Sequence, residues 1–125
     1  MEFTPSGHAD LPVRFNNLGI SYGCRFEHTG NLQDIDHAIS HHQSAVELTP
    51  SGHTNLPALL NNLGNSYSGR FKHTGDLQDI DHALSHHQSA VQFTPSSHAD
   101  LLTRFSNLGN SYLIRSDHTS NLQVC

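Results

Sequence analysis

Twelve of the 125 residues are histidine, whose imidazole can bind metal ions and can change its protonation state near neutral pH. Some of them follow an aspartate by three and by seven residues, a spacing that places all three side chains on one face of a helix. The two sets are Asp34, His37 and His41, and Asp79, His82 and His86. Either set could hold Zn²⁺ with one open coordination position. Duplication of an exposed stripe would produce the same pattern, and we expect no resident metal or other cofactor.

Two further histidines, His42 and His87, lie on an apolar stripe, the first between Ala38 and Ala45. This position favours a partly buried packing role over a role as ligand or base. Serine, histidine and aspartate are abundant, but no serine lies in a nucleophile elbow and no glycine-rich phosphate loop occurs. The sequence therefore predicts that the protein is not an enzyme.

These residues recur because the sequence repeats itself every 45 residues, starting at Thr4, Thr49 and Thr94. The first two copies, residues 4–48 and 49–93, are identical at 32 of 45 positions, and the third, residues 94–125, is shorter. A unit of this size cannot bury its apolar side alone, so neighbouring units must stack. We therefore expect one repeat domain over residues 1–125.

Each full copy is predicted to form two helices, because apolar residues recur at steps of three and four. The first stripe is Leu11, Phe15, Leu18, Tyr22 and Phe26, repeated as Leu56, Leu60, Leu63, Tyr67 and Phe71. The second is Leu32, Ile35, Ala38, Ile39, Ala45 and Val46, repeated as Leu77, Ile80, Ala83, Leu84, Ala90 and Val91. We expect five helices near residues 11–27, 32–48, 56–72, 77–93 and 101–115, and no sheet.

Residues that begin and end helices lie at the expected bounds. Serine, threonine, asparagine and aspartate cap helix starts, proline is tolerated in a first turn, and glycine follows a helix end. By these rules Asp10 with Pro12 and Asn55 with Pro57 mark the first helix of a unit, Gly30 and Gly75 its end, and Asn31 and Asp76 the start of the second helix.

The same spacing resembles that of tetratricopeptide repeats. Leu60, Leu63, Gly64 and Tyr67 match the family's large–x–x–Leu-Gly–x–x–Tyr signature, and Ala83, Ala90 and Pro95 match its small–small–proline signature. The longer period resembles the extended repeats of kinesin light chains and the long arrays of basidiomycete fungi. The resemblance implies an all-α solenoid of antiparallel helix pairs, about two and a half repeats long, that serves as a protein–protein interaction scaffold.

An asparagine-rich column follows from this resemblance, in which the residue after the bulky signature position faces a concave groove. Asparagine offers both a donor and an acceptor and can hydrogen-bond the backbone of an extended peptide. The residues expected to contact a peptide are Asn16, Asn61, Asn65, Ser106 and Asn110, with Ile20 on the same face. The alternative is that they are solvated or stabilise contacts between helices.

The third copy departs from the other two. Ser116 replaces the phenylalanine of the stripe and Ser120 replaces the glycine at the helix end. One turn of a second helix is expected before Cys125, which leaves the apolar side of residues 101–115 uncovered at Leu101, Phe105, Leu108 and Tyr112. We expect weak end-to-end self-association, stronger if Cys125 oxidises. The departure also supports a second hypothesis, a structural spacer or fragment of a larger signalling protein. A histidine-rich metal-binding protein is a weaker alternative.

The composition of the chain limits the classes of partner that it is expected to bind. Six Lys and Arg against eleven Asp and Glu give a net charge of −5, which offers no basic surface for nucleic acid. No apolar run approaches the roughly 18 residues of a membrane span, and the first residues lack the pattern of a signal peptide. The only two cysteines imply no disulfide framework, and Cys24 is expected to be a passive packing residue. We expect a cytoplasmic protein with a protein or peptide partner, and neither nucleic acid nor membrane.

Overall fold

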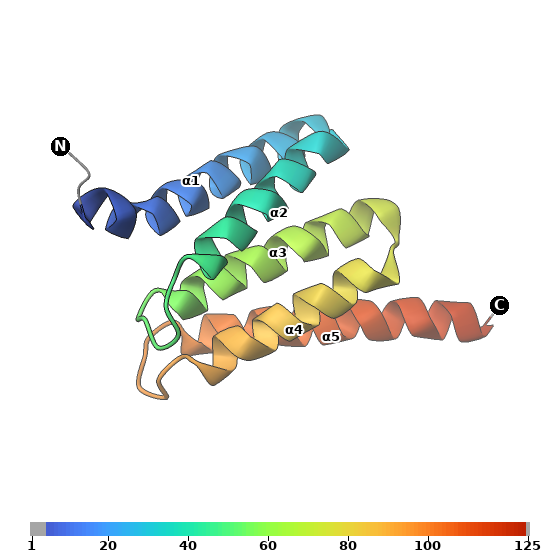
Figure 1. Ribbon diagram of the computed structural model, residues 1–125. Coiled ribbons are helices and arrows are strands. Elements are labelled where there is room, and N and C mark those ends of the chain that lie inside the picture. The colour runs from blue at the N-terminus through green and yellow to red at the C-terminus, as the bar shows by residue number, and fades with distance from the viewer. Residues whose placement is uncertain (1–4, 125) are drawn as a thin grey trace.

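A computed structural model describes residues 5–124 of the chain, and this part of the chain is all-α, with five helices and no strand. The helices are α1 (Pro5–Thr29), α2 (Leu32–Glu47), α3 (Leu56–Thr74), α4 (Leu77–Gln92) and α5 (Leu101–Val124). From the top of Figure 1, α1, α2 and α3 follow in chain order, and α4 and α5 overlap at the bottom of the view. The predicted number of helices and the absence of a sheet over these residues are confirmed.

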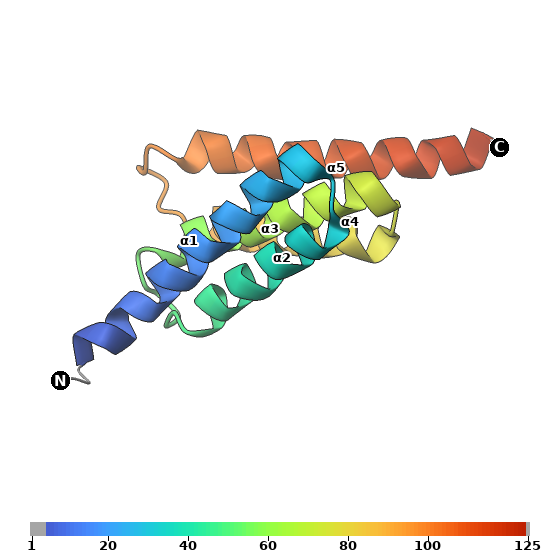
Figure 2. The ribbon, with the colours of Figure 1, turned by 90° about the horizontal axis from the view of Figure 1, so that it is seen from above.

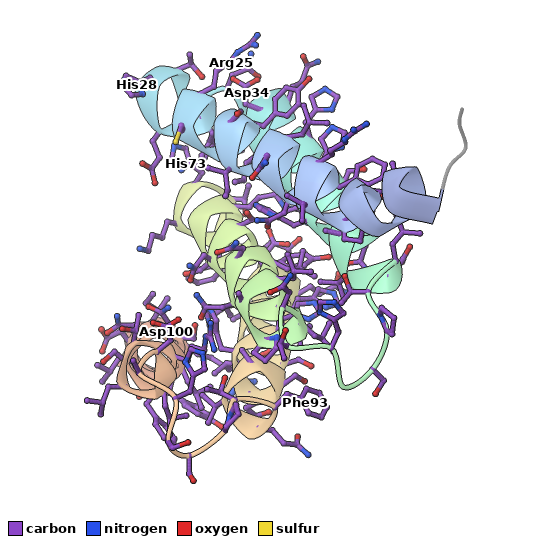
Figure 3. All side chains as sticks on the ribbon, turned by 90° about the vertical axis from the view of Figure 1, so that its left-hand side faces the viewer. Arg25, His28, Asp34, His73, Phe93 and Asp100 are labelled. Carbon is purple, nitrogen blue, oxygen red and sulfur yellow. The ribbon has the colours of Figure 1, made fainter. Side chains whose placement is uncertain are left out.

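The helices form two layers. In the view of Figure 3, in which α5 is seen end-on, α1, α3 and α5 lie on one side and α2 and α4 on the other. Each helix packs on its neighbours in the chain, and α3 also contacts both α1 and α5. The α1–α2 pair runs diagonally to α3, α4 and α5 when viewed from above, so successive pairs are rotated (Figure 2). We call the surface formed by the first layer the α1–α3–α5 face.

The predicted caps explain how each pair turns back on itself. Gly30 and Gly75 have φ values of 69° and 72°, in the left-handed region that glycine adopts at low cost. The side chains of Asn31 and Asp76 then accept hydrogen bonds from the backbone N–H two residues later. Asn55, by contrast, makes no capping bond through its side chain.

Helix α1 begins earlier than predicted, at Pro5, and Pro12 lies inside it instead of in its first turn. Asp10 is therefore not an N-cap. In the second and third copies the matching segment forms a turn that is tied to the preceding helix. The Thr49 hydroxyl donates to the Ala45 carbonyl at 2.7 Å, and the Thr94 hydroxyl does the same at Ala90. In the first copy the matching segment is instead the first part of α1.

Helix α5 extends to Val124, well beyond the predicted end near residue 115. No second helix begins at Asn121, because Ser120 stands where Gly30 and Gly75 make the left-handed turn. Cys125, on which the expected oxidation depends, lies outside the described residues. Among the described residues, no helix combines the length and apolar character needed to cross a membrane.

The core is centred on the second copy. Leu63 is completely buried and packs with Phe26, Ile35, Ala38 and Ile39 of the first copy. The prediction that its counterpart Leu18 is buried is wrong, because this side chain is 46% exposed. Leu32 and Leu77, expected on the apolar side of the second helices, are also largely exposed in the first turns of α2 and α4.

Ion pairs join one unit to the next. The Arg70 guanidinium donates to Asp36 of the preceding unit at 2.8 Å and to both carboxylate oxygens of the buried Asp79 at 2.8 and 3.1 Å. Arg115 repeats the bond between units, 2.6 Å from Asp81. Arg70 and Arg115 occupy the same repeat position, so the same kind of ion pair joins each unit to the one before it.

Candidate binding groove on the α1–α3–α5 face

A pocket of about 510 Å³ opens on the α1–α3–α5 face, across the C-terminal half of α3. Its walls come from the end of α1, from α3 and from the middle of α5, and His87 of α4 also lines it. A second pocket of about 220 Å³ lies between α1 and α3 and shares Phe26, Glu27, Asn65 and Gly69 with the first. Because the two pockets are adjacent and share these residues, we describe them together as the α3 groove.

Asn65 and Asn110, two of the predicted contact residues, line this groove. Both side chains are exposed. The Asn65 side-chain oxygen is 2.9 Å from Nε2 of His87, which leaves its amide N–H groups directed elsewhere. The Asn110 amide has no hydrogen-bond partner among the described residues. Ile20, at the same repeat position, lines the smaller pocket. This position therefore supplies the polar groups that a ligand could reach.

The other predicted position serves contacts between helices. Asn16 accepts a hydrogen bond at 3.1 Å from the Asn62 amide of the next unit, and Asn61 accepts one at 3.0 Å from Asn107. Asn16 also lies 3.1 Å from Nδ1 of His42. Ser106, the third residue at this position, is exposed and lines neither pocket of the α3 groove.

Sequence reasoning missed the residues that complete the groove. Lys72 and His73 near the end of α3 line it, together with Glu27 of α1. The His73 ring points from α3 toward α1 and packs on Phe26 with 4.5 Å between centroids (Figure 3). The repeat gave no signal for this contact, since Phe26 and His73 come from different positions of successive units. The asparagine pairs did carry a signal, the Asn-Asn doublet of the first two copies.

The floor of the groove is built on a histidine that packs against a glycine. A Cβ added to Gly64 would lie 2.6 Å from the His87 ring, and one added to Gly19 would lie 2.7 Å from the His42 ring. Only glycine lets the ring approach the helix backbone this closely. The signature glycine of each full unit thus leaves a gap on the helix surface, which we call the notch of that glycine. The histidine ring of the partner helix fills this notch.

These two histidines are more completely buried than predicted, at 3% exposure for His42 and 2% for His87. Burial lowers the pKa of His42 to about 4, and the nearby His41 acts in the same direction. Burial likewise lowers the pKa of His87 to about 4, with a contribution from His86, against a weaker opposing effect of the hydrogen bond to the Asn61 carbonyl. Both rings are neutral at physiological pH.

Ser111, His87 and Asn65 form a short hydrogen-bonded chain beneath the groove. The His87 Nε2–H donates to Asn65, and Nδ1 accepts from the Ser111 hydroxyl at 2.8 Å. A serine beside an imidazole can act as a nucleophile if a substrate reaches it and the imidazole is basic enough. Ser111 is only 1% exposed and the pKa of His87 is about 4. This pair therefore lacks both the access and the basicity for such chemistry.

The candidate metal ligands are directed to other partners. Asp34 is buried and accepts a hydrogen bond from Thr29 at 3.1 Å, while Asp79 is held by Arg70. The histidines stack on the signature tyrosines, with His37 and His41 at 4.9 and 5.4 Å from Tyr22 and with His82 and His86 at 4.9 and 5.6 Å from Tyr67. Over the part of the chain that the structure describes, no three His, Cys, Asp or Glu side chains are grouped to hold a metal ion.

The notch at Gly64 gives a direct prediction. In Gly64→Ala the new methyl group would overlap the His87 ring, which Ser111 and Asn65 hold in place. We expect a loss of about 1–3 kcal/mol in the free energy of unfolding, measured in urea, even though alanine is the better helix former. The matched control is Gly109→Ala at the same position of the third copy, where no described atom lies within 4 Å. It should gain up to about 1 kcal/mol. Equal changes in the free energy of unfolding for the two variants would contradict a close contact between Gly64 and His87.

Comparison of the chain with protein-family models, with curated proteins and with solved structures finds no match.

Proposed function

We propose that this chain is a protein-interaction module of the tetratricopeptide type, and that the α3 groove binds an extended segment of a partner protein. The observation that carries the proposal is the position of Asn65 and Asn110, whose exposed amides line a 510 Å³ pocket over a well-packed floor. The repeat signature supports the same class of function, because the matching residues of the family line its ligand-binding face.

The lining of the groove suits a peptide backbone better than a charged ligand. Its polar groups are largely neutral amides and hydroxyls, and its two charged side chains, Glu27 and Lys72, have opposite signs. Amide groups can pair with the N–H and C=O groups of any extended chain. Phe26 and Ile114 add apolar surface for a side chain of the ligand. We therefore expect recognition of an extended peptide of low net charge, with modest affinity.

A displayed library of short random peptides, selected on the wild-type chain, tests this proposal. Selected peptides should bind Asn110→Ala about three- to tenfold more weakly, as expected for one lost hydrogen bond, and Asn110→Trp should bind them more weakly still because its side chain fills the groove. Fluorescence anisotropy with labelled peptides gives the dissociation constants.

The matched controls are Asn17→Ala and Asn17→Trp, at an exposed asparagine of α1 that lines neither pocket of the groove. Both should bind the selected peptides like the wild type. If the substitutions at Asn17 weaken binding of the selected peptides as much as those at Asn110, the binding site lies elsewhere. Failure to enrich any peptide would favour the structural spacer.

A further inference from the structure

A second surface, on the opposite side of α5 from the groove, lacks the cover that its counterparts have. Phe105 and Tyr112 are 50% and 48% exposed, and Gly109 between them is also exposed. Leu101 and Leu108, which were expected to be uncovered as well, are partly buried. Phe105, Gly109 and Tyr112 lie on one face of the helix, and we call this face the α5 strip; the still more exposed Leu102 and Leu113 lie beside it.

The preceding unit shows what covers such a strip. The counterparts on α3 are Leu60, Gly64 and Tyr67, and α4 packs over all three. Leu60 is 7% exposed and packs with Ala90. The notch of Gly64 holds the His87 ring, and Tyr67 stacks on His82 and His86. Helix α2 covers α1 in the same way, with His42 in the notch of Gly19 and with His37 and His41 on Tyr22.

The covering helices share one arrangement of side chains. Two completely buried alanines flank the buried histidine, as Ala38–His42–Ala45 in α2 and Ala83–His87–Ala90 in α4. The small residues allow close approach of the two helices, and the imidazole enters the glycine notch. The notch of Gly109 is open, with no described atom within 4 Å of the position of a Cβ.

We propose that the α5 strip is a docking site for a partner helix of the α2/α4 type, with the pattern Ala-x-x-x-His-x-x-Ala. The histidine of the partner enters the notch of Gly109, its alanines pack beside Phe105, and a histidine one residue before the buried one stacks on Tyr112. Ser116, in place of the buried Phe71, offers less apolar surface beyond Tyr112, so binding concentrates on the α5 strip and not on the end of the helix.

A peptide with the sequence of residues 76–92 is the probe, since α4 is the helix that covers the same face of α3. Titration of the fluorescently labelled peptide with the full chain should show saturable binding, accompanied by a gain in helical circular dichroism. In Gly109→Ala the methyl group would occupy the notch, so affinity should fall about tenfold or more, while the variant itself stays folded. The control is Ser21→Ala, at an exposed residue of α1 that lines neither pocket of the α3 groove, which should bind the peptide like the wild type.

A substitution in the peptide distinguishes docking in the notch from non-specific binding. A peptide in which the histidine that corresponds to His87 is replaced by alanine should bind the wild type weakly and should lose no further affinity on Gly109→Ala. Binding of the original peptide that is unchanged by Gly109→Ala would overturn the proposal. So would absence of peptide binding together with a dimer in sedimentation that persists in Gly109→Ala, which would assign the strip to a second copy of the chain. The α3 groove lies on another side of α5, so its peptides should bind Gly109→Ala normally whichever result is obtained.

Discussion

Acidification from pH 7 to pH 5 should remove about 4 kcal/mol from the free energy of unfolding, through His42 and His87 alone. The pKa of each ring is about 4 in the folded protein, against 6.5 as the ordinary value. A lowered pKa means that the unfolded chain binds protons more readily than the folded one, so stability rises with pH. The contribution is complete above pH 6.5, fades as the pH falls below that value, and levels off below pH 4. At pH 5 each ring accounts for about 2 kcal/mol.

Urea unfolding between pH 4 and pH 8 measures this dependence, and NMR titration of the ring protons reports the two pKa values directly. A double variant, His42→Gln with His87→Gln, should be less stable at pH 7 but should lose less stability between pH 7 and pH 5. Rings that titrate at or above pH 6.5 would contradict the burial from which the prediction starts.

The second large effect is expected at Leu63. In Leu63→Ala a cavity forms among Phe26, Ile35, Ala38 and Ile39, which belong to the preceding unit. We expect a loss of about 2–4 kcal/mol, because the well-packed surroundings can collapse only in part. Thermal or urea unfolding followed by circular dichroism at 222 nm measures the change.

Leu18 provides the matched control, because it occupies the same position of the first copy and is 46% exposed. Leu18→Ala should cost less than about 1 kcal/mol, and the exposed His82→Ala should stay within about 0.5 kcal/mol. Similar losses at Leu18 and Leu63 would show that stability does not depend on packing between units.

Much of the fold was predictable because the repeat fixes local structure. The left-handed glycines and the capping residues Asn31 and Asp76 lie where their residue types indicated. The predicted helix bounds were wrong at the two ends of the helical array. The start of α1 and the end of α5 depend on whether a neighbouring helix or a glycine is present to form the turn, and a pattern read from the central copy does not contain this information.

The candidate site was predictable in part, for a related reason. The repeat indicated which positions of the first helices are polar, and the structure places Asn65 and Asn110 in the groove. It did not separate them from Asn16 and Asn61, whose side chains contact the next unit. The contact between the buried histidines and the signature glycines also escaped prediction, because it joins residues more than twenty positions apart on two different helices.

The contacts between units have a consequence for how such a chain can change in length. Arg70 reaches Asp36 across 34 residues, and Arg115 reaches Asp81 across the same interval. The asparagine pairs span 46 residues in both cases. Each kind of contact has the same sequence separation in both units. Deletion of residues 49–93, which is one 45-residue period, would therefore bring Arg115 to Asp36 and Asn107 to Asn16. Because the histidine and its glycine notch belong to the same unit, they would be removed together. Gain or loss of a whole 45-residue unit in a gene therefore preserves both kinds of contact between units, whereas an insertion of another length within a helix shifts their register.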